Sequence, residues 1–258
     1  MPVRLGENSR AHISEEFITA MATVRHRRVV GTRDEIRKAE SEVARRLRLH
    51  DPGSFQVTQA RNQLAILRKE LLTTVGKEND GDVASAGRAG SDYQITRLHR
   101  LPYTHFAMRK DGSGGEFFVG STRPVFTEPF LYRGETRRLD LGPYFVCVSA
   151  DHLGGTYRPS VHLIPERAPL IGARSLHHVS DTAAPGTNPL DTIPRTCWGG
   201  FNNVIQSSWY SADVPEIFSM LHSYLTRVNP NDALAGIHSL TFANLERVQD
   251  APRTRSRR

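Results

Sequence analysis

The chain has 258 residues, a formal net charge of +7 and 38% hydrophobic residues, which supports a packed core and argues against wholesale disorder. No apolar run approaches the roughly eighteen residues of a membrane-spanning helix, and no secretory signal opens the sequence, so we expect a cytoplasmic protein without a membrane partner. The basic residues accompany no nucleic-acid-binding motif, which argues against specific binding of nucleic acid.

Residues 1–75 are predicted to form an N-terminal helical extension. Thr32 and Glu35 make a capping-box pattern, which predicts a helix start at that point. The turn-forming residues 51–54 then predict a break. Apolar side chains recur at helical spacing on both sides of this break, at Ile36, Ala39, Val43 and Leu47 and at Val57, Ala60, Leu64, Leu67 and Leu71. This spacing predicts an antiparallel helical hairpin, with an ordinary amphipathic helix packed on the main domain as the alternative.

The segment 76–91 is rich in Gly, Ala, Ser and Asp and is predicted to be a flexible linker. From residue 92 onward, the short segments YQITRL, YTHFAM, EFFVG and YFVCVSA are rich in aromatic and β-branched residues. Turn sequences such as KDGSGG separate them, so they predict the strands of an antiparallel meander. Cys147 lies inside the last of these segments and is predicted to be a buried, inert thiol.

A long stretch over residues 168–208 contains several prolines and no convincing helix or strand pattern, and Cys197 lies within it. Loops of this length inside a compact domain are uncommon and are usually functional. A helix is predicted next, with Asp213 as its cap and Pro215 in its first turn. The sequence Asn229-Pro230 is predicted to end it.

The order of these predicted elements over residues 93–245 resembles the ubiquitin-conjugating (UBC-like) fold. In that family a Tyr-x-Gly-Gly turn precedes the third strand, and Tyr132-Arg133-Gly134-Glu135 is similar to it. Where a Tyr-Pro-x-x-Pro-Pro-x-Val segment enters the fourth strand, this chain has Tyr157-Arg158-Pro159-Ser160-Val161. The most specific match is to the family's Leu-x-x-x-x-Asn-Pro-x-Asp-x-Leu motif, which here runs from Leu225 to Leu234 and includes Asp232.

The active-site region of the family contains a His-Pro-Asn motif, the active cysteine and a tryptophan shortly after it. This chain has His177-His178-Val179, Cys197 and Trp209 in that order. The Pro-Asn of the motif is absent, extra residues precede the cysteine, and the last helical region is shortened. Such departures resemble a bacterial or viral conjugation system, for which antiviral defence is the implied purpose.

The resemblance implies an α+β, UBC-like domain over residues 92–246, with an antiparallel four-stranded meander, a long active-site loop and flanking helices. The N-terminal helical hairpin precedes this domain, and a basic, disordered tail is predicted at 247–258. The implied function is to accept a ubiquitin-like protein as a thioester on Cys197 and to transfer it to a target amine. The implied partners are therefore the ubiquitin-like protein, its activating enzyme and a protein target.

The resemblance also implies roles for the residues near the cysteine. Thiolate is the reactive form of Cys197, and amine attack on the thioester creates an oxyanion that needs a donor. Asn202, Asn203 or His178 could replace the missing asparagine of the motif, while Asp232 matches an acidic residue that orients or deprotonates the amine. This chemistry requires no metal and no organic cofactor.

Three alternatives remain open at this point. The first is a catalytically silent UBC-like module that binds a ubiquitin-like protein or scaffolds a complex. The second is a zinc site, although the spacing of its candidate ligands matches no known signature; they are His162, His177, His178 and Cys197. The third is a cysteine hydrolase, which would normally place its cysteine at a helix N-terminus, and the sequence after Gly199-Gly200 does not predict one.

Overall fold

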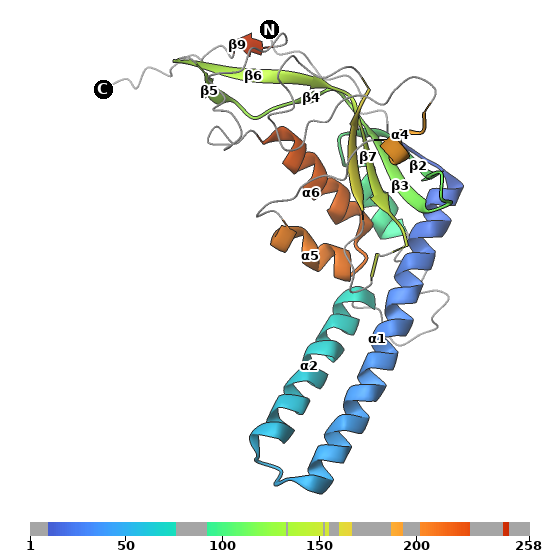
Figure 1. Cartoon of the computed structure of the whole chain (residues 1–258), viewed down its shortest axis with the longest axis vertical. Coiled ribbons are helices and arrows are strands. Elements are labelled where there is room, and N and C mark those ends of the chain that lie inside the picture. The colour runs from blue at the N-terminus through green and yellow to red at the C-terminus, as the bar shows by residue number, and fades with distance from the viewer. Residues whose placement is uncertain are drawn as a thin grey trace.

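The structure is a computed structural model that describes residues 10–75, 92–132, 134–151, 153–154, 160–166, 187–192, 202–227 and 245–247 (Figure 1). The predicted linker at 76–91, and all but the first residue of the predicted tail at 247–258, lie outside these residues. The fold combines helices with mixed β-sheet, which confirms the α+β class. None of the described helices is both long enough and apolar enough to cross a membrane.

The two long helices form the predicted hairpin. Helix α1 spans Glu15–Leu49 and α2 spans Phe55–Val75, so the predicted break at 51–54 is confirmed. Inside the hairpin Val57, Ala60 and Leu67 are buried. The hairpin extends away from the sheets, and its turn lies at the far end (Figure 1).

The predicted helix start at Thr32 is wrong. Helix α1 begins at Glu15, where the side chain of Ser14 accepts a hydrogen bond from the backbone N–H of Phe17 at 3.2 Å. Thr32 lies in the middle of this helix, and its hydroxyl donates to the carbonyl of Arg28 at 2.9 Å. A threonine inside a helix can donate its hydroxyl hydrogen bond to a carbonyl of the preceding turn, so it does not need to cap a helix start.

The main sheet has five strands in the order β1-β2-β3-β7-β8. The short β1 pairs parallel with β2, and the remaining pairs are antiparallel. Their bounds are β1 His12–Ile13, β2 Tyr103–Lys110, β3 Glu116–Thr122, β7 Tyr144–Ser149 and β8 Val161–Pro165. The segments YTHFAM, EFFVG and YFVCVSA are therefore confirmed as strands.

The prediction of a strand at YQITRL is wrong, because residues 92–98 are helical. Gln94 and Leu98, one helical turn apart, are both buried. In a strand Thr96 would lie on the same face as these two side chains, but Thr96 is exposed, and this pattern is that of a helix.

Three strands of a second sheet, β4, β5 and β6, lie between β3 and β7 in the sequence. The strand order of this sheet is β4-β6-β5. The short strand β9 pairs antiparallel with residues 137–139 of β6. The bounds are β4 Val125–Phe126, β5 Phe130–Tyr132, β6 Glu135–Gly142 and β9 Leu245–Arg247. The turn predicted at 132–135 does connect two strands, since Tyr132 is paired with Glu135. The four antiparallel strands of the main sheet are thus not consecutive in the sequence.

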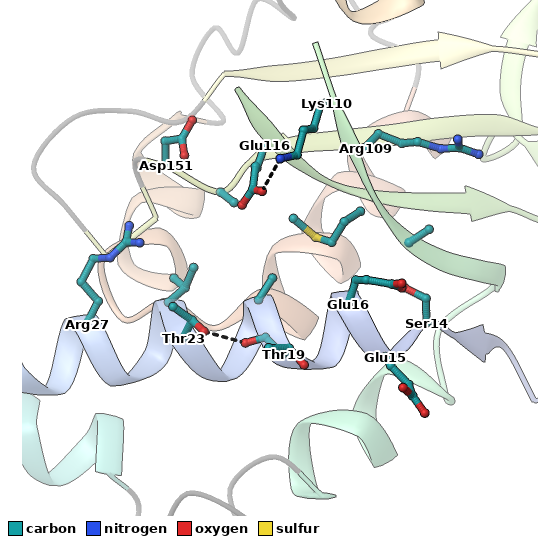
Figure 2. A pocket seen from close by; sticks show the side chains of 15 residues that line it. Ser14, Glu15, Glu16, Thr19, Thr23, Arg27, Arg109, Lys110, Glu116 and Asp151 are labelled. Atoms are coloured by element: carbon teal, nitrogen blue, oxygen red, sulfur yellow. Dashed lines mark hydrogen bonds and ion pairs between the residues drawn. The ribbon is translucent and has the colours of Figure 1, made fainter. Parts of the chain in front are cut away.

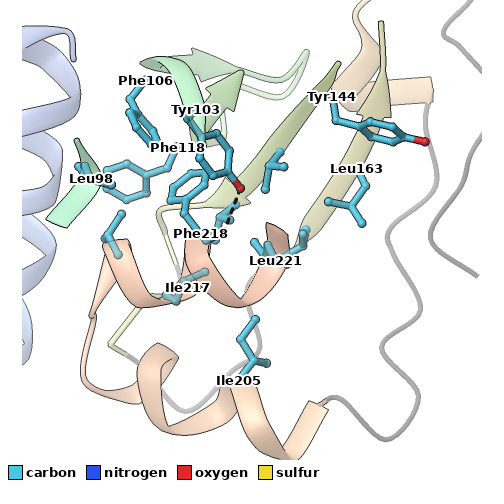
Figure 3. Packing of buried hydrophobic residues seen from close by; sticks show 14 of the residues in the cluster. Leu98, Tyr103, Phe106, Phe118, Tyr144, Leu163, Ile205, Ile217, Phe218 and Leu221 are labelled. Carbon is cyan, nitrogen blue, oxygen red and sulfur yellow. Dashed lines mark hydrogen bonds between the residues drawn. The ribbon is translucent and has the colours of Figure 1, made fainter. Parts of the chain in front are cut away.

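The main core lies between the sheet, α1 and the helices α5 (Asn202–Tyr210) and α6 (Val214–Thr226). Tyr103, Phe106 and Phe118 of the sheet meet Phe218 of α6, and the Tyr103 hydroxyl donates to the Phe218 carbonyl at 3.0 Å (Figure 3). Phe17 of α1 packs its ring edge-on against Phe118, with centroids 4.9 Å apart. The first turns of α1 therefore belong to this core.

The opposite face of the main sheet carries a smaller apolar cluster. Leu190 of the short helix α4 (Pro189–Thr192) covers it, together with Phe117, Cys147 and Ile164 from the strands. The carboxylate of Asp191 accepts a hydrogen bond from the backbone N–H of Gly112 at 2.8 Å and so holds α4 on the β2–β3 turn. Within the predicted irregular stretch 168–208, residues 189–192 and 202–208 are helical, so that prediction is wrong for those two parts.

Candidate functional site

The predicted site residues lie almost entirely outside the described part of the chain. This is true of Cys197, His178 and Asp232. Asn203 is the second residue of α5, and Asn202 is the first, but neither side chain is among those described. The candidate site is therefore built from the elements on both sides of the Cys197 segment.

Helix α5 begins at Asn202, directly after the segment that contains Cys197. Its inner face buries Ile205 and Trp209, four residues apart, in the main core. The carbonyl of Trp209 accepts hydrogen bonds from the N–H groups of Gly154 and Ala212, each at 3.1 Å. Trp209 is thus a packing residue that fixes α5 against its neighbours. The sequence after Gly199-Gly200 was not predicted to start a helix, which argued against a cysteine hydrolase, but α5 does begin at Asn202.

Helix α6 follows α5 after a tight turn. Asp213 caps α6 by accepting from the N–H of Glu216 at 3.1 Å, and Pro215 occupies its first turn, which confirms the prediction for this helix start. Arg97 reaches across from residues 92–98 and binds Asp213 at 2.7 Å and Glu216 at 2.6 Å. Burial alone would lower the pKa of Arg97, but the hydrogen bond that Arg97 donates to Asp213 and the charges of both carboxylates outweigh burial and raise that pKa. Arg97 therefore stays charged and holds the start of α6.

Arg28 is a buried cation at the junction of the hairpin and α5. Its side chain forms an ion pair with Glu70 of α2 and lies 3.7 Å from a carboxylate oxygen of Glu35. Its guanidinium also lies over the ring of Tyr210, the last residue of α5, at 4.3 Å from the centroid. One side chain thus links α1, α2 and α5.

Sequence reasoning missed Arg28, because the run Arg25-His26-Arg27-Arg28 is typical of a solvated helix face. A signal was nevertheless present. Phe17, Met21 and Val24 continue to position 28 in steps of four, three and four, which places Arg28 on the buried face of α1.

Cys147 is confirmed as a buried residue of β7, with 2% of its surface exposed. Burial raises the pKa of its thiol, and the charge of Arg109 lowers it only in part. A thiol in this state is a poor nucleophile. Cys147, the cysteine in the described part of the chain, is therefore not an alternative to Cys197 as the reactive cysteine.

The zinc alternative gains no support from the residues described. His162 is buried in β8 and packs edge-on against Phe117, with ring centroids 5.6 Å apart. The other three candidate ligands lie outside the described residues. Among those that are described, no three His, Cys, Asp or Glu side chains gather closely enough to hold a metal ion.

A groove of about 1050 Å³ separates the first turns of α1 from the sheet (Figure 2). Glu15, Glu16 and Arg27 line it from α1, while Lys110 and Glu116 line it from the sheet. Lys110 and Glu116 form an ion pair at 3.2 Å across β2 and β3. No sequence motif marks this groove, because its lining comes from segments that are far apart in the chain.

Comparisons of the chain with family models, with curated proteins and with solved structures find no match. A function for this chain must therefore be argued from its own residues. Two features of the chain bear on its function, the elements around Cys197 and the groove beside α1.

Proposed function

We propose that the chain is a UBC-like conjugating protein, which accepts a ubiquitin-like protein as a thioester on Cys197 and transfers it to an amine of a protein target. The observation that carries this proposal is the order and packing of the elements that flank Cys197. Antiparallel strands precede it, and α5 with the buried Trp209 and the Asp213-capped α6 follow it and pack on the sheet. The motif residues that resemble the conjugating family stand in this same order.

The chemistry is an exchange of acyl groups at sulfur. The Cys197 thiolate attacks the thioester carbonyl of the ubiquitin-like protein on its activating enzyme, and the enzyme's thiolate leaves. The target amine then attacks the new thioester, loses its proton, and expels the Cys197 thiolate as the amide bond forms. Both steps need a thiolate of moderate pKa, which an adjacent helix N-terminus favours. The start of α5 at Asn202 is compatible with this requirement.

The remaining roles follow from the resemblance. Asp232 would accept the proton of the attacking amine. Asn203, Asn202 or His178 would donate a hydrogen bond to the oxyanion of the tetrahedral intermediate. The backbone of Asn202 and Asn203 lies in the first turn of α5, so both are held by a helix that is fixed in the core through Ile205.

The test is co-expression of the full chain with its genomic neighbours, followed by electrophoresis without reductant. We expect a band heavier by one small protein, which disappears with reductant and in Cys197→Ala. Cys197→Ser should give an oxyester that survives reductant, because an ester is not cleaved by thiols as a thioester is. Cys147→Ala is the matched control and should keep the band.

Two results would contradict the proposal. If no adduct forms in the presence of an active activating enzyme and its ubiquitin-like protein, the silent binding module is the better description. If Cys197 is acylated by small esters and releases the acid to water without passing it to an amine, the chain is a cysteine hydrolase.

A further inference from the structure

The strand β2 has an open edge beside the groove. The N–H of Asp111 donates to the carbonyl of Gly115 at 3.0 Å, which fixes the hydrogen-bonding alternation of the β2–β3 ladder. Residues 107, 109 and 111 direct their backbone groups to β3, and residues 106, 108 and 110 direct theirs to the other edge. The carbonyl of Phe106 agrees with this assignment, because it accepts from the N–H of Ser14 at 3.0 Å.

Both ends of this outer edge are occupied. Pairing with β1 stops at Ile13 and Phe106, after which the chain turns into α1. At the other end, the side chain of Asn188 donates to the carbonyl of Lys110 at 3.0 Å. Between these ends, the N–H and carbonyl of Met108 and the N–H of Lys110 have no partner among the described residues. Three backbone groups in a row on a sheet edge are a template for a further strand.

The groove lies on the face to which such a strand would direct a side chain. Met108 lines the groove, and a residue paired with Met108 would project from the same face of the sheet. Ala20 and Val24 of α1 also line the groove, so an aliphatic stem has apolar contacts there. Glu15 and Glu16 lie at the end nearest Ser14, and neither forms an ion pair within the described part of the chain (Figure 2). Three cations also line the groove, at Arg27, Arg109 and Lys110, but Lys110 is paired with Glu116 and the four lining carboxylates outnumber the cations. This balance favours a cationic end on the inserted side chain.

We propose that the β2 edge at Met108–Lys110 binds an extended segment of a partner protein, which adds as an antiparallel strand and inserts one Lys or Arg side chain into the groove beside α1. In the antiparallel direction, one residue opposite Met108 exchanges both hydrogen bonds with it, and its side chain projects toward the groove. The backbone bonds provide affinity, and the inserted side chain provides selectivity. This binding does not involve Cys197 and is independent of the proposed conjugation.

The test titrates the full-length, ¹⁵N-labelled chain with acetyl-Thr-Val-Lys-Val-Thr-amide and with versions that have Val or Glu in place of the lysine. We expect saturable shifts of the Met108 and Lys110 amide resonances, with a Kd on the order of 0.1–1 mM for the lysine peptide. The valine peptide should bind about threefold more weakly, and the glutamate peptide about tenfold more weakly. The Cys197→Ala chain should give the same values.

Peptide methylation tests the strand geometry. An N-methyl group on the central lysine removes the donor to the Met108 carbonyl and should weaken binding about tenfold or more. An N-methyl group on the next residue toward the C-terminus faces away from β2 and should weaken it much less. Equal effects of the two methyl groups would overturn the strand-addition geometry.

Protein variants test the groove. Glu15→Gln with Glu16→Gln should remove the preference for lysine over valine, whereas the matched pair Asp34→Asn with Glu40→Gln on the hairpin should keep it. Thr19→Trp, at an exposed position that lines the groove, should weaken the lysine peptide about tenfold, and Thr58→Trp on α2 should not. Absence of saturable shifts at Met108 and Lys110, or a preference for the glutamate peptide, would overturn the proposal.

Discussion

The guanidinium of Arg28 lies 4.3 Å from the ring centroid of Tyr210, and the same guanidinium forms an ion pair with Glu70. Arg28 is 4% exposed, so this cation is balanced by its neighbours and not by water. The Nε atom of Arg28 has no hydrogen-bond partner within the described chain. The hairpin is therefore connected to α5 by a charged side chain whose removal would leave Glu70 without its cation.

Arg28→Ala should destabilise the protein by about 2–4 kcal/mol, because it removes one partner of a largely buried ion pair and the cation–π contact. Urea unfolding followed by circular dichroism measures this change. Arg45→Ala is the matched control, because Arg45 forms an exposed ion pair with Glu42, and its loss should cost less than about 1 kcal/mol. Equal costs for the two variants would contradict the role assigned to Arg28.

Gly120→Ala should destabilise the protein by about 1–3 kcal/mol, which is typical of overpacking in a core. A Cβ atom at this position would lie 2.8 Å from the rings of Tyr103 and Phe218. Gly31 lies inside α1, and a Cβ atom added there would meet nothing within 4 Å, so Gly31→Ala should stabilise by up to about 1 kcal/mol. Thermal unfolding of the two variants should therefore shift in opposite directions.

Cys147 should react slowly with a thiol reagent in the native protein. Burial raises the pKa of this thiol, so its thiolate fraction at pH 8 is smaller than that of an ordinary cysteine. Comparing Cys197→Ala, in which only Cys147 remains, with Cys147→Ala in an Ellman assay measures each thiol separately. Rapid labelling of Cys147 without denaturant would contradict its position in the sheet.

Acidification should loosen the pairing of β1 with β2. The Nδ1 atoms of His12 and His105 lie 3.1 Å apart, so one must accept a hydrogen bond in its neutral form. Burial lowers the pKa of His105, and the charges of His12 and Arg109 lower it further. The folded-state pKa of His105 therefore lies below its ordinary value of 6.5. Neutral His105 contributes to the stability of the fold above pH 6.5, and this contribution is lost as the pH falls through the folded-state pKa.

Hydrogen exchange of the Ser14 amide, which donates to Phe106, measures this loosening. After correction for the intrinsic pH dependence of exchange, protection should decrease between about pH 7 and pH 5. The decrease should be smaller in His12→Gln, which cannot acquire a second positive charge. The same pH dependence in both proteins would contradict the proposed coupling of the two rings.

The strands β2, β3 and β7 could be predicted because tight turns bound them and their residues alternate or are continuously apolar. Helix α6 was predictable from local chemistry, since Asp213, Pro215 and Glu216 are all favourable at a helix start. The hairpin was predictable from its apolar spacing. These features depend on residues that are close together in the sequence.

The errors have a common physical cause, which is the dominance of tertiary contacts over local propensity. Residues 92–98 contain Ile95 and Thr96, which favour strands, yet Leu98 is buried in the core and Arg97 binds Asp213 on α6. Helix α5 contains several weak helix formers, but Ile205 and Trp209 are buried one turn apart. The core residues and Asp213, which these two helices contact, lie outside their own local sequences.

The candidate site divides in the same way. Cys197 could be proposed from its order relative to other motifs, and that proposal remains a prediction because its segment lies outside the described residues. The groove beside α1 could not be predicted, because its lining combines Glu15 and Arg27 with Met108, Lys110 and Asp151. Only the pairing of β1 with β2 and the crossing of α1 over the sheet bring these residues together.

The second sheet leaves the main sheet and returns to it at almost the same point. The backbone N–H of Tyr144, at the start of β7, donates to the hydroxyl of Thr122, at the end of β3, at 2.8 Å. The two ends of the intervening segment are thus fastened together, and the entropic cost of closing such a segment grows only with the logarithm of its length. The far part of the second sheet can therefore be lengthened or shortened without a change of register between β3 and β7.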